Sequence, residues 1–104
     1  MRVASGLVQH GEVQKDLTKA RSKLNSKEVR DVLVRIGMDF DGEPSLFFGV
    51  LLTAYGSADS RLADVTGRVA GLLFDEIRPY EKWGLHPYFN FTADPEHFSG
   101  DGWV

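Results

Sequence analysis

The spacing of hydrophobic residues changes along this 104-residue chain, and each spacing predicts a different element. Between residues 12 and 25 these residues recur after four, three and four positions, which places them in one stripe along a helix. The stripe consists of Val13, Leu17, Ala20 and Leu24. Because so narrow a stripe can pack against one surface only, we expect a peripheral helix here.

Residues 32–41 instead alternate between apolar and other side chains, which predicts a strand. Its apolar positions are Val32, Val34, Ile36, Met38 and Phe40. The Asp41-Gly42 pair that follows is typical of a tight turn, so we expect a β-hairpin and a return strand over about 46–54. That strand is apolar on both faces, because Leu46, Phe48, Val50 and Leu52 alternate with Phe47 and Leu51. A strand of this kind is usually covered on both sides.

A second helix is predicted over about 60–78, with Asp59 or Ser60 as its cap and Pro79 as its end. Its apolar arc is wide enough to contact two surfaces. Small residues recur at Ala63, Gly67 and Gly71, where another backbone can approach closely. A third strand is predicted over 88–92, with Phe89 and Phe91 toward the core.

These elements predict an α+β fold, a small α-β-β-α-β domain. We expect a three-stranded sheet built on the β-hairpin, one main helix packed on one face, and a peripheral N-terminal helix. The chain is long enough for one domain over 1–104. Within it we expect a peripheral basic helix over 1–27, a core over 28–94 and a tail over 95–104.

Composition narrows the class of protein. The chain contains no cysteine, which excludes disulfides, thiolate metal sites and cysteine nucleophiles. No apolar run has the length of a membrane span, and no secretory signal follows Met1. We therefore expect a cytoplasmic protein without contact to a membrane.

Charge is unevenly distributed. Residues 1–35 hold eight basic and four acidic side chains, whereas the whole chain has a net charge of −3. A basic segment can contact nucleic acid, and the candidate contacts are Lys15, Lys19, Lys23 and Lys27. Since a dedicated nucleic-acid binder is usually basic overall, this function is an alternative and not the favoured one.

Motifs for catalysis are missing from the sequence. Neither a phosphate-binding glycine loop nor a nucleophile elbow occurs. Carboxylates gather at Asp39, Asp41 and Glu43, and a second group of conceivable metal ligands comprises His86, Asp94, Glu96 and His97. Neither group has the spacing of a known metal site. We therefore assign no catalytic, metal or cofactor residue, expect no enzyme, and keep a small carboxylate- or metal-dependent enzyme as the second alternative.

The α-β-β-α-β order, with Ala70-Gly71 inside the helix and Pro87 before an aromatic strand, resembles the type II KH topology. Within it, the pattern is similar to the ribosome-binding factor A family over roughly residues 30–94. This resemblance implies RNA binding. That family has a kinked Ala-x-Gly helix beside a basic surface. Here Ala70 directly precedes Gly71, and residues 36–104 contain more acidic than basic side chains.

The favoured hypothesis follows from the second apolar face of the return strand. A single sheet with one main helix covers one face, so the other face is free for contact. We therefore expect a non-enzymatic protein–protein interaction protein that self-associates, for example as a homodimer, or is an accessory subunit of a larger complex. The predicted contact residues are Phe47, Leu51, Leu33, Tyr88 and Trp103. The alternative to a partner on this face is the protein's own N-terminal helix.

Overall fold

A computed structural model describes residues 6–96, with side chains described from residue 11 onward. Its three strands, β1 (Val29–Met38), β2 (Pro44–Leu52) and β3 (His86–Thr92), form one sheet in the order β1-β2-β3. The β1–β2 pair is antiparallel and the β2–β3 pair is parallel. The hairpin, the central position of β2 and the α+β class are confirmed.

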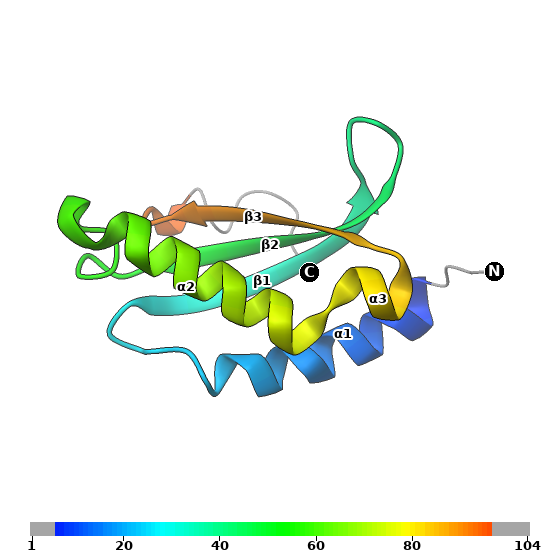
Figure 1. Cartoon of the computed structure of the whole chain (residues 1–104), viewed down its shortest axis with the longest axis horizontal. Coiled ribbons are helices and arrows are strands. Elements are labelled where there is room, and N and C mark those ends of the chain that lie inside the picture. The colour runs from blue at the N-terminus through cyan, green and yellow to red at the C-terminus, as the bar shows by residue number, and fades with distance from the viewer. Residues whose placement is uncertain (1–5, 97–104) are drawn as a thin grey trace.

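Three helices accompany the sheet: α1 (Gly6–Arg21), α2 (Asp59–Ile77) and the short α3 (Pro79–Trp83). Both long helices lie on the same side of the sheet, with α1 alongside α2 (Figure 1). Within residues 6–96 no helix is both long and apolar enough to cross a membrane.

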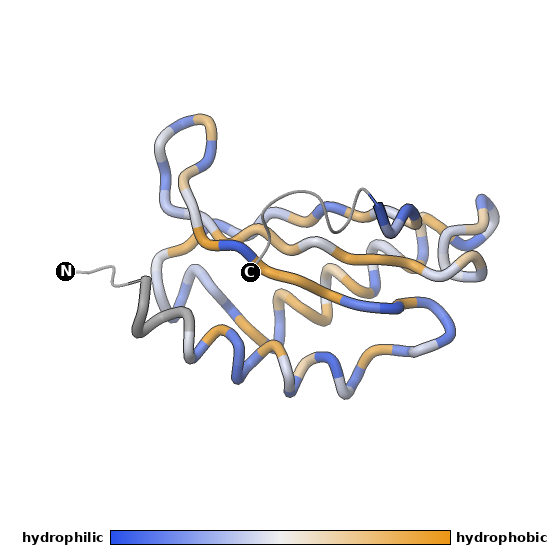
Figure 2. The backbone as a smooth tube through the Cα atoms, turned by 180° about the vertical axis from the view of Figure 1, so that it is seen from behind, coloured by the Kyte–Doolittle hydropathy of each residue, from blue (hydrophilic) through white to orange (hydrophobic). Residues whose placement is uncertain are grey.

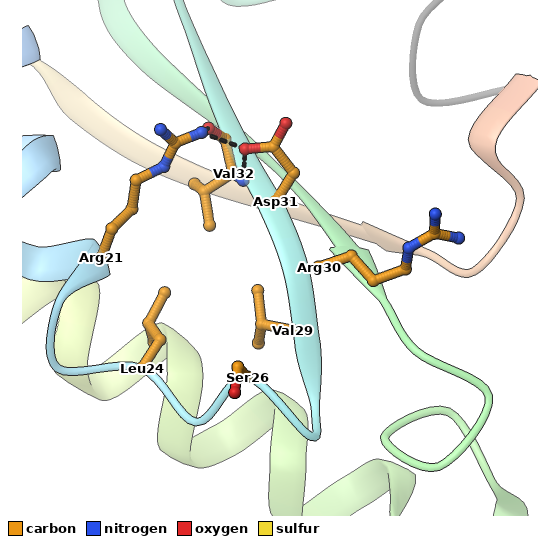
Figure 3. Close-up of a pocket in the computed structure, with 7 residues that line it drawn as sticks. All are labelled: Arg21, Leu24, Ser26, Val29, Arg30, Asp31 and Val32. Atoms are coloured by element: carbon orange, nitrogen blue, oxygen red, sulfur yellow. Dashed lines mark hydrogen bonds and ion pairs between the residues drawn. The ribbon is translucent and has the colours of Figure 1, made fainter.

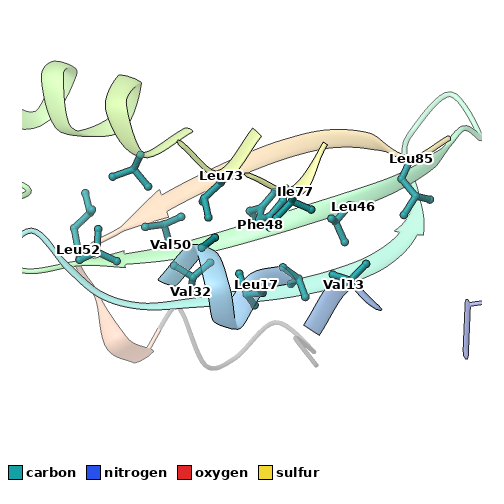
Figure 4. Packing of buried hydrophobic residues seen from close by; sticks show 14 of the residues in the cluster. Val13, Leu17, Val32, Leu46, Phe48, Val50, Leu52, Leu73, Ile77 and Leu85 are labelled. Carbon is teal, nitrogen blue, oxygen red and sulfur yellow. The ribbon is translucent and has the colours of Figure 1, made fainter. Parts of the chain in front are cut away.

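The core lies between these helices and one face of the sheet (Figure 4). Strand β2 contributes four side chains at 0–2% exposure, and α2 contributes one side chain from each of four successive turns. These residues are Leu46, Phe48, Val50 and Leu52 from β2, and Val65, Val69, Leu73 and Ile77 from α2. Apolar stretches along the strands are visible in Figure 2, as is the alternation of apolar and polar residues along α1.

The stripe of α1 enters this same core, since Val13, Leu17 and Ala20 are fully buried. The helix therefore does not cover the second face of β2, contrary to the alternative considered above. Polar contacts fix it in place. Glu12 accepts a 2.9 Å hydrogen bond from the Trp83 indole, and Asp16 lies 2.6 Å from the Lys82 ammonium.

The hairpin differs from the prediction at its tip. Strand β1 ends at Met38, and Phe40 is 91% exposed in the turn, where a core position was expected. The reason is geometric, because the hairpin extends beyond the helices that cover the sheet (Figure 1). Gly42 has a φ of 81°, as the Asp-Gly turn requires.

The predicted caps of α2 are wrong at its start. Its N-cap is Ala58, which makes no side-chain cap, although Asp59 follows in the first turn. At its end, Arg78 has a left-handed backbone with φ 49°, and Pro79 begins α3. Proline therefore ends one helix and starts the next, since it lacks an N–H but has the φ of a first helical turn. Helix α3 has no counterpart among the elements predicted from the sequence.

A close contact joins the start of β1 to the loop after β2. The Glu28 carbonyl accepts a 2.9 Å hydrogen bond from the Thr53 amide, and the Glu28 carboxylate is held by two 3.0 Å bonds from Arg68. Gly56 packs directly on Glu28, because a β-carbon added there would lie 2.4 Å from the Glu28 carbonyl oxygen. Only glycine fits without movement of the backbone.

The substitution Gly56→Ala is therefore expected to destabilise the fold by about 1–3 kcal/mol, because the new methyl group overlaps a backbone that is itself hydrogen-bonded. Urea unfolding measures the change as a lower midpoint at an unchanged slope. Gly71→Ala is the matched control, since an added β-carbon there meets nothing within 4 Å. A Gly56→Ala midpoint equal to that of the wild type would contradict the assigned contact.

Candidate interaction surface

The sheet face opposite the helices, called the open face here, carries the second set of β2 side chains. Residues 6–96 provide no helix or strand that lies over it (Figures 1 and 2). Register places Arg35, Phe47 and Tyr88 in one row across the three strands. Leu33 lies in the next row, opposite Gly49 of β2.

Three side chains of this row are stacked. The rings of Phe47 and Tyr88 lie 5.4 Å apart between centroids and 18° from parallel. The guanidinium carbon of Arg35 lies 4.4 Å from the centroid of Phe47, within the range of a cation–π contact. Both faces of the Phe47 ring are therefore occupied, by Arg35 on one side and Tyr88 on the other.

The hydroxyl of Tyr88 connects this row to the hairpin. It donates a 2.7 Å hydrogen bond to Oδ2 of Asp39, whose Oδ1 accepts from the amides of Asp41 and Glu43 at 2.9 Å. The bond from Tyr88 is the main reason that the pKa of Asp39 is lowered. The same bond raises the pKa of Tyr88, because the protonated phenol is the donor.

The predicted contact residues are brought together only in part. Phe47 and Leu33 are half-buried on the open face, and Tyr88 is 38% exposed. Leu51 lies on the same face by register but is only 6% exposed, so it belongs to the floor of the surface. Trp103 lies outside the described residues.

Arg35 and Asp39 were missed as parts of this surface. The signal for Arg35 was present in the sequence, because Arg35 alternates with Val34 and therefore points to the face opposite the core. Its position opposite Phe47 depends on the hairpin register, which the Asp41-Gly42 turn alone did not fix.

Of the four lysines proposed for nucleic acid, Lys23 is paired within the fold. Lys23 donates a 2.7 Å hydrogen bond to Glu76, and this contact lowers the pKa of Glu76. Lys15, Lys19 and Lys27 are exposed. Part of the positive charge of this segment, at Lys23 just after α1, is thus neutralised by α2 within the fold.

The acidic turn serves the hairpin itself. Asp39 uses both carboxylate oxygens for the contacts given above, so it caps the turn from within. His86 packs against Tyr80, with ring centroids 5.0 Å apart, and its Nε2 lies 3.8 Å from Glu43. Among the described side chains no three His, Asp or Glu residues are grouped as metal ligands. His97 lies outside the described residues.

Two hollows lie away from the open face. A pocket of about 300 Å3 at the start of β1 contains Arg21 and Asp31, which form an ion pair (Figure 3). A larger groove of about 680 Å3 runs between α2 and the end of β3. Its walls are mainly apolar, with Leu62 and Gly67 on one side and Phe91 on the other.

Comparisons with protein families, with curated proteins and with solved structures found no match. The resemblance to the KH topology therefore gains no support from a relative, and function must be argued from the surface itself.

The Asp39–Tyr88 bond predicts a pH dependence. Folding lowers the pKa of Asp39. The contribution of the Asp39 carboxylate to stability is therefore fully present when the pH is above the ordinary pKa of an aspartate, and it is lost as the pH falls through the folded-state pKa of Asp39. The raised pKa of Tyr88 has its effect at high pH. The contribution of the protonated Tyr88 hydroxyl to stability is lost as the pH rises through the folded-state pKa of Tyr88.

Tyr88→Phe keeps the ring but removes the donor. We expect the pKa of Asp39 to move up toward 3.8, as followed by NMR of its carboxyl carbon. The stability difference from wild type should be largest near neutral pH and should shrink at both extremes. Tyr80→Phe, at an exposed tyrosine without this bond, should leave the Asp39 titration unchanged. An unaltered titration in Tyr88→Phe would disprove the assigned bond.

Proposed function

We propose that the chain is a non-enzymatic protein-interaction module that binds a protein through its open face, either as an accessory subunit of a larger complex or by self-association. The observation that carries this proposal is the second apolar face of β2. It presents the stacked Phe47 and Tyr88 on a floor that includes Leu51, while both long helices lie on the other side. Apolar side chains on a sheet face that no helix covers often serve as contact sites.

The composition of the surface supports this proposal. Aromatic residues and arginine are enriched at the centres of protein interfaces, where they provide much of the binding energy. Here Arg35, Phe47 and Tyr88 form a stacked row whose side chains hold each other in place. Because these side chains are already ordered in the free protein, less side-chain conformational entropy is lost when a partner binds.

The same geometry disfavours single-stranded nucleic acid on this face. Bases bind such sheets by stacking on free aromatic ring faces. Both faces of Phe47 are already occupied, and the Asp39 carboxylate beside Tyr88 repels phosphate. A protein surface needs no free ring face, since it can pack against the ring edges.

We propose a cytoplasmic location with this function, because the chain has no cysteine to protect or to oxidise.

The test is the mass of the assembly purified from native extract, measured by light scattering. The double variant Phe47→Ser/Tyr88→Ser is expected to lose the bound partner, because it removes the stacked rings without touching the buried core. Its mass should therefore fall below that of the wild-type assembly. The control is Tyr80→Ser, which removes an exposed tyrosine on α3 and should leave the mass unchanged.

Circular dichroism of the double variant separates loss of binding from loss of folding. A wild-type chain with no bound protein, or a folded double variant with an unchanged assembly, would overturn the proposed function.

A further inference from the structure

The two edges of the sheet differ in how well they are protected against pairing with a further strand. At the β1 edge, the outward backbone groups of Val32 are already used. Arg21 donates a 2.8 Å hydrogen bond to the Val32 carbonyl, and the Val32 amide donates one of 2.8 Å to Asp31 (Figure 3). Charged side chains on an edge strand prevent another strand from adding to it.

The β3 edge has no such charges. Within the described residues β3 pairs with β2 alone, and residues 86–93 include no Lys, Arg, Asp or Glu. Proline is tolerated in an edge strand where its nitrogen faces away from the neighbouring strand. Since amide direction alternates along a strand, the amides of Phe89 and Phe91 point outward in the same way as the nitrogen of Pro87. The edge thus offers donors to a further strand.

Beside this edge lies a flank of α2 that is also uncharged. We define the α2 flank as the uncharged residues of α2 that line the groove beside β3, which are Leu62, Ala63, Thr66 and Gly67. Leu62 is 38% exposed, and a β-carbon added at Gly67 would meet nothing within 4 Å. One charged residue, Asp59, lies at the end of the groove between this flank and β3.

We propose that a second copy of this chain occupies the β3 edge, with the two β3 strands paired antiparallel across a two-fold axis. In a two-fold contact each surface meets itself, so a charged patch would repel its own copy. The β3 edge and the α2 flank carry almost no charge and therefore can meet themselves without repulsion. The charged β1 edge cannot be joined without breaking the contacts of Arg21 and Asp31.

The arrangement also accounts for the α2 flank. Joining two β3 strands extends the sheet to six strands, with both α2 helices on the same side of it. The two flanks then face one another across the axis, and Ala63 and Gly67 permit close approach of the helices. Leu62 and the groove beside Phe91 become buried. The open faces of both copies stay free, so this dimer does not depend on the proposed function.

The test compares two glycines of the same helix. Gly67→Lys places a long charged side chain in the α2 flank, whereas Gly71→Lys places it one turn further along α2, outside the groove beside β3. Both sites are exposed, with nothing within 4 Å of an added β-carbon, and lysine favours a helix more than glycine does. Neither change should therefore unfold the monomer.

Sedimentation equilibrium is expected to give the wild type and Gly71→Lys twice the 11.6 kDa mass of the chain. Gly67→Lys should raise the dimer dissociation constant by about tenfold or more. Hydrogen exchange at the Phe89 and Phe91 amides should be slow in the dimer and faster in Gly67→Lys.

A wild type that stays at 11.6 kDa, or a Gly67→Lys variant that dimerises as well as Gly71→Lys, would overturn the proposed dimer. Loss of a partner in Phe47→Ser/Tyr88→Ser with the doubled chain mass retained would support both proposals. Retention of that partner with the doubled mass would remove the proposed function and leave the dimer standing.

Discussion

The structure depends on the apolar character of β2 on both of its faces. One face is sealed by α1 and α2, where Leu46 and Phe48 are fully buried. The opposite face cannot be sealed by the same helices, because side chains alternate across the sheet. It is stabilised instead by the stack of Arg35, Phe47 and Tyr88. A constraint of the core strand thus creates the surface that we assign to a partner.

Much of the fold was predictable, because hydrophobic spacing reports which side of an element is buried. The alternation in β1 and β2 and the arc of α2 gave the sheet and its main helix. The same pattern could not decide where α1 packs, since Val13 and Leu17 fit either face of the sheet. Nor could spacing predict α3, which depends on the left-handed backbone of Arg78 before Pro79. Phe40 shows where alternation fails as a predictor of burial, because the alternating pattern continues into a part of the hairpin that the helices do not cover.

The candidate surface was predicted less completely than the fold. Phe47 and Tyr88 follow from alternation alone, but their stacking depends on the parallel register of β2 and β3. The hydrogen bond from Tyr88 to Asp39 joins residues far apart in sequence, so no local pattern could reveal it. The difference between the two edges of the sheet could not be predicted either, because the β1 edge is protected only through the contacts that Arg21 makes with it in the folded chain. Together these contacts give the described part of the chain one uncharged edge and one aromatic face, which are the two surfaces that we assign to partners.

The central claim is that the open face is covered by a protein partner, either a different protein or a second copy of this chain, in the native assembly. Hydroxyl-radical footprinting of that assembly, against the isolated chain, tests it most directly. The account predicts that oxidation of Phe47 and Tyr88 falls in the assembly, whereas Tyr80 on α3 is oxidised equally in both samples. Equal oxidation of Phe47 and Tyr88 in the two samples would contradict it.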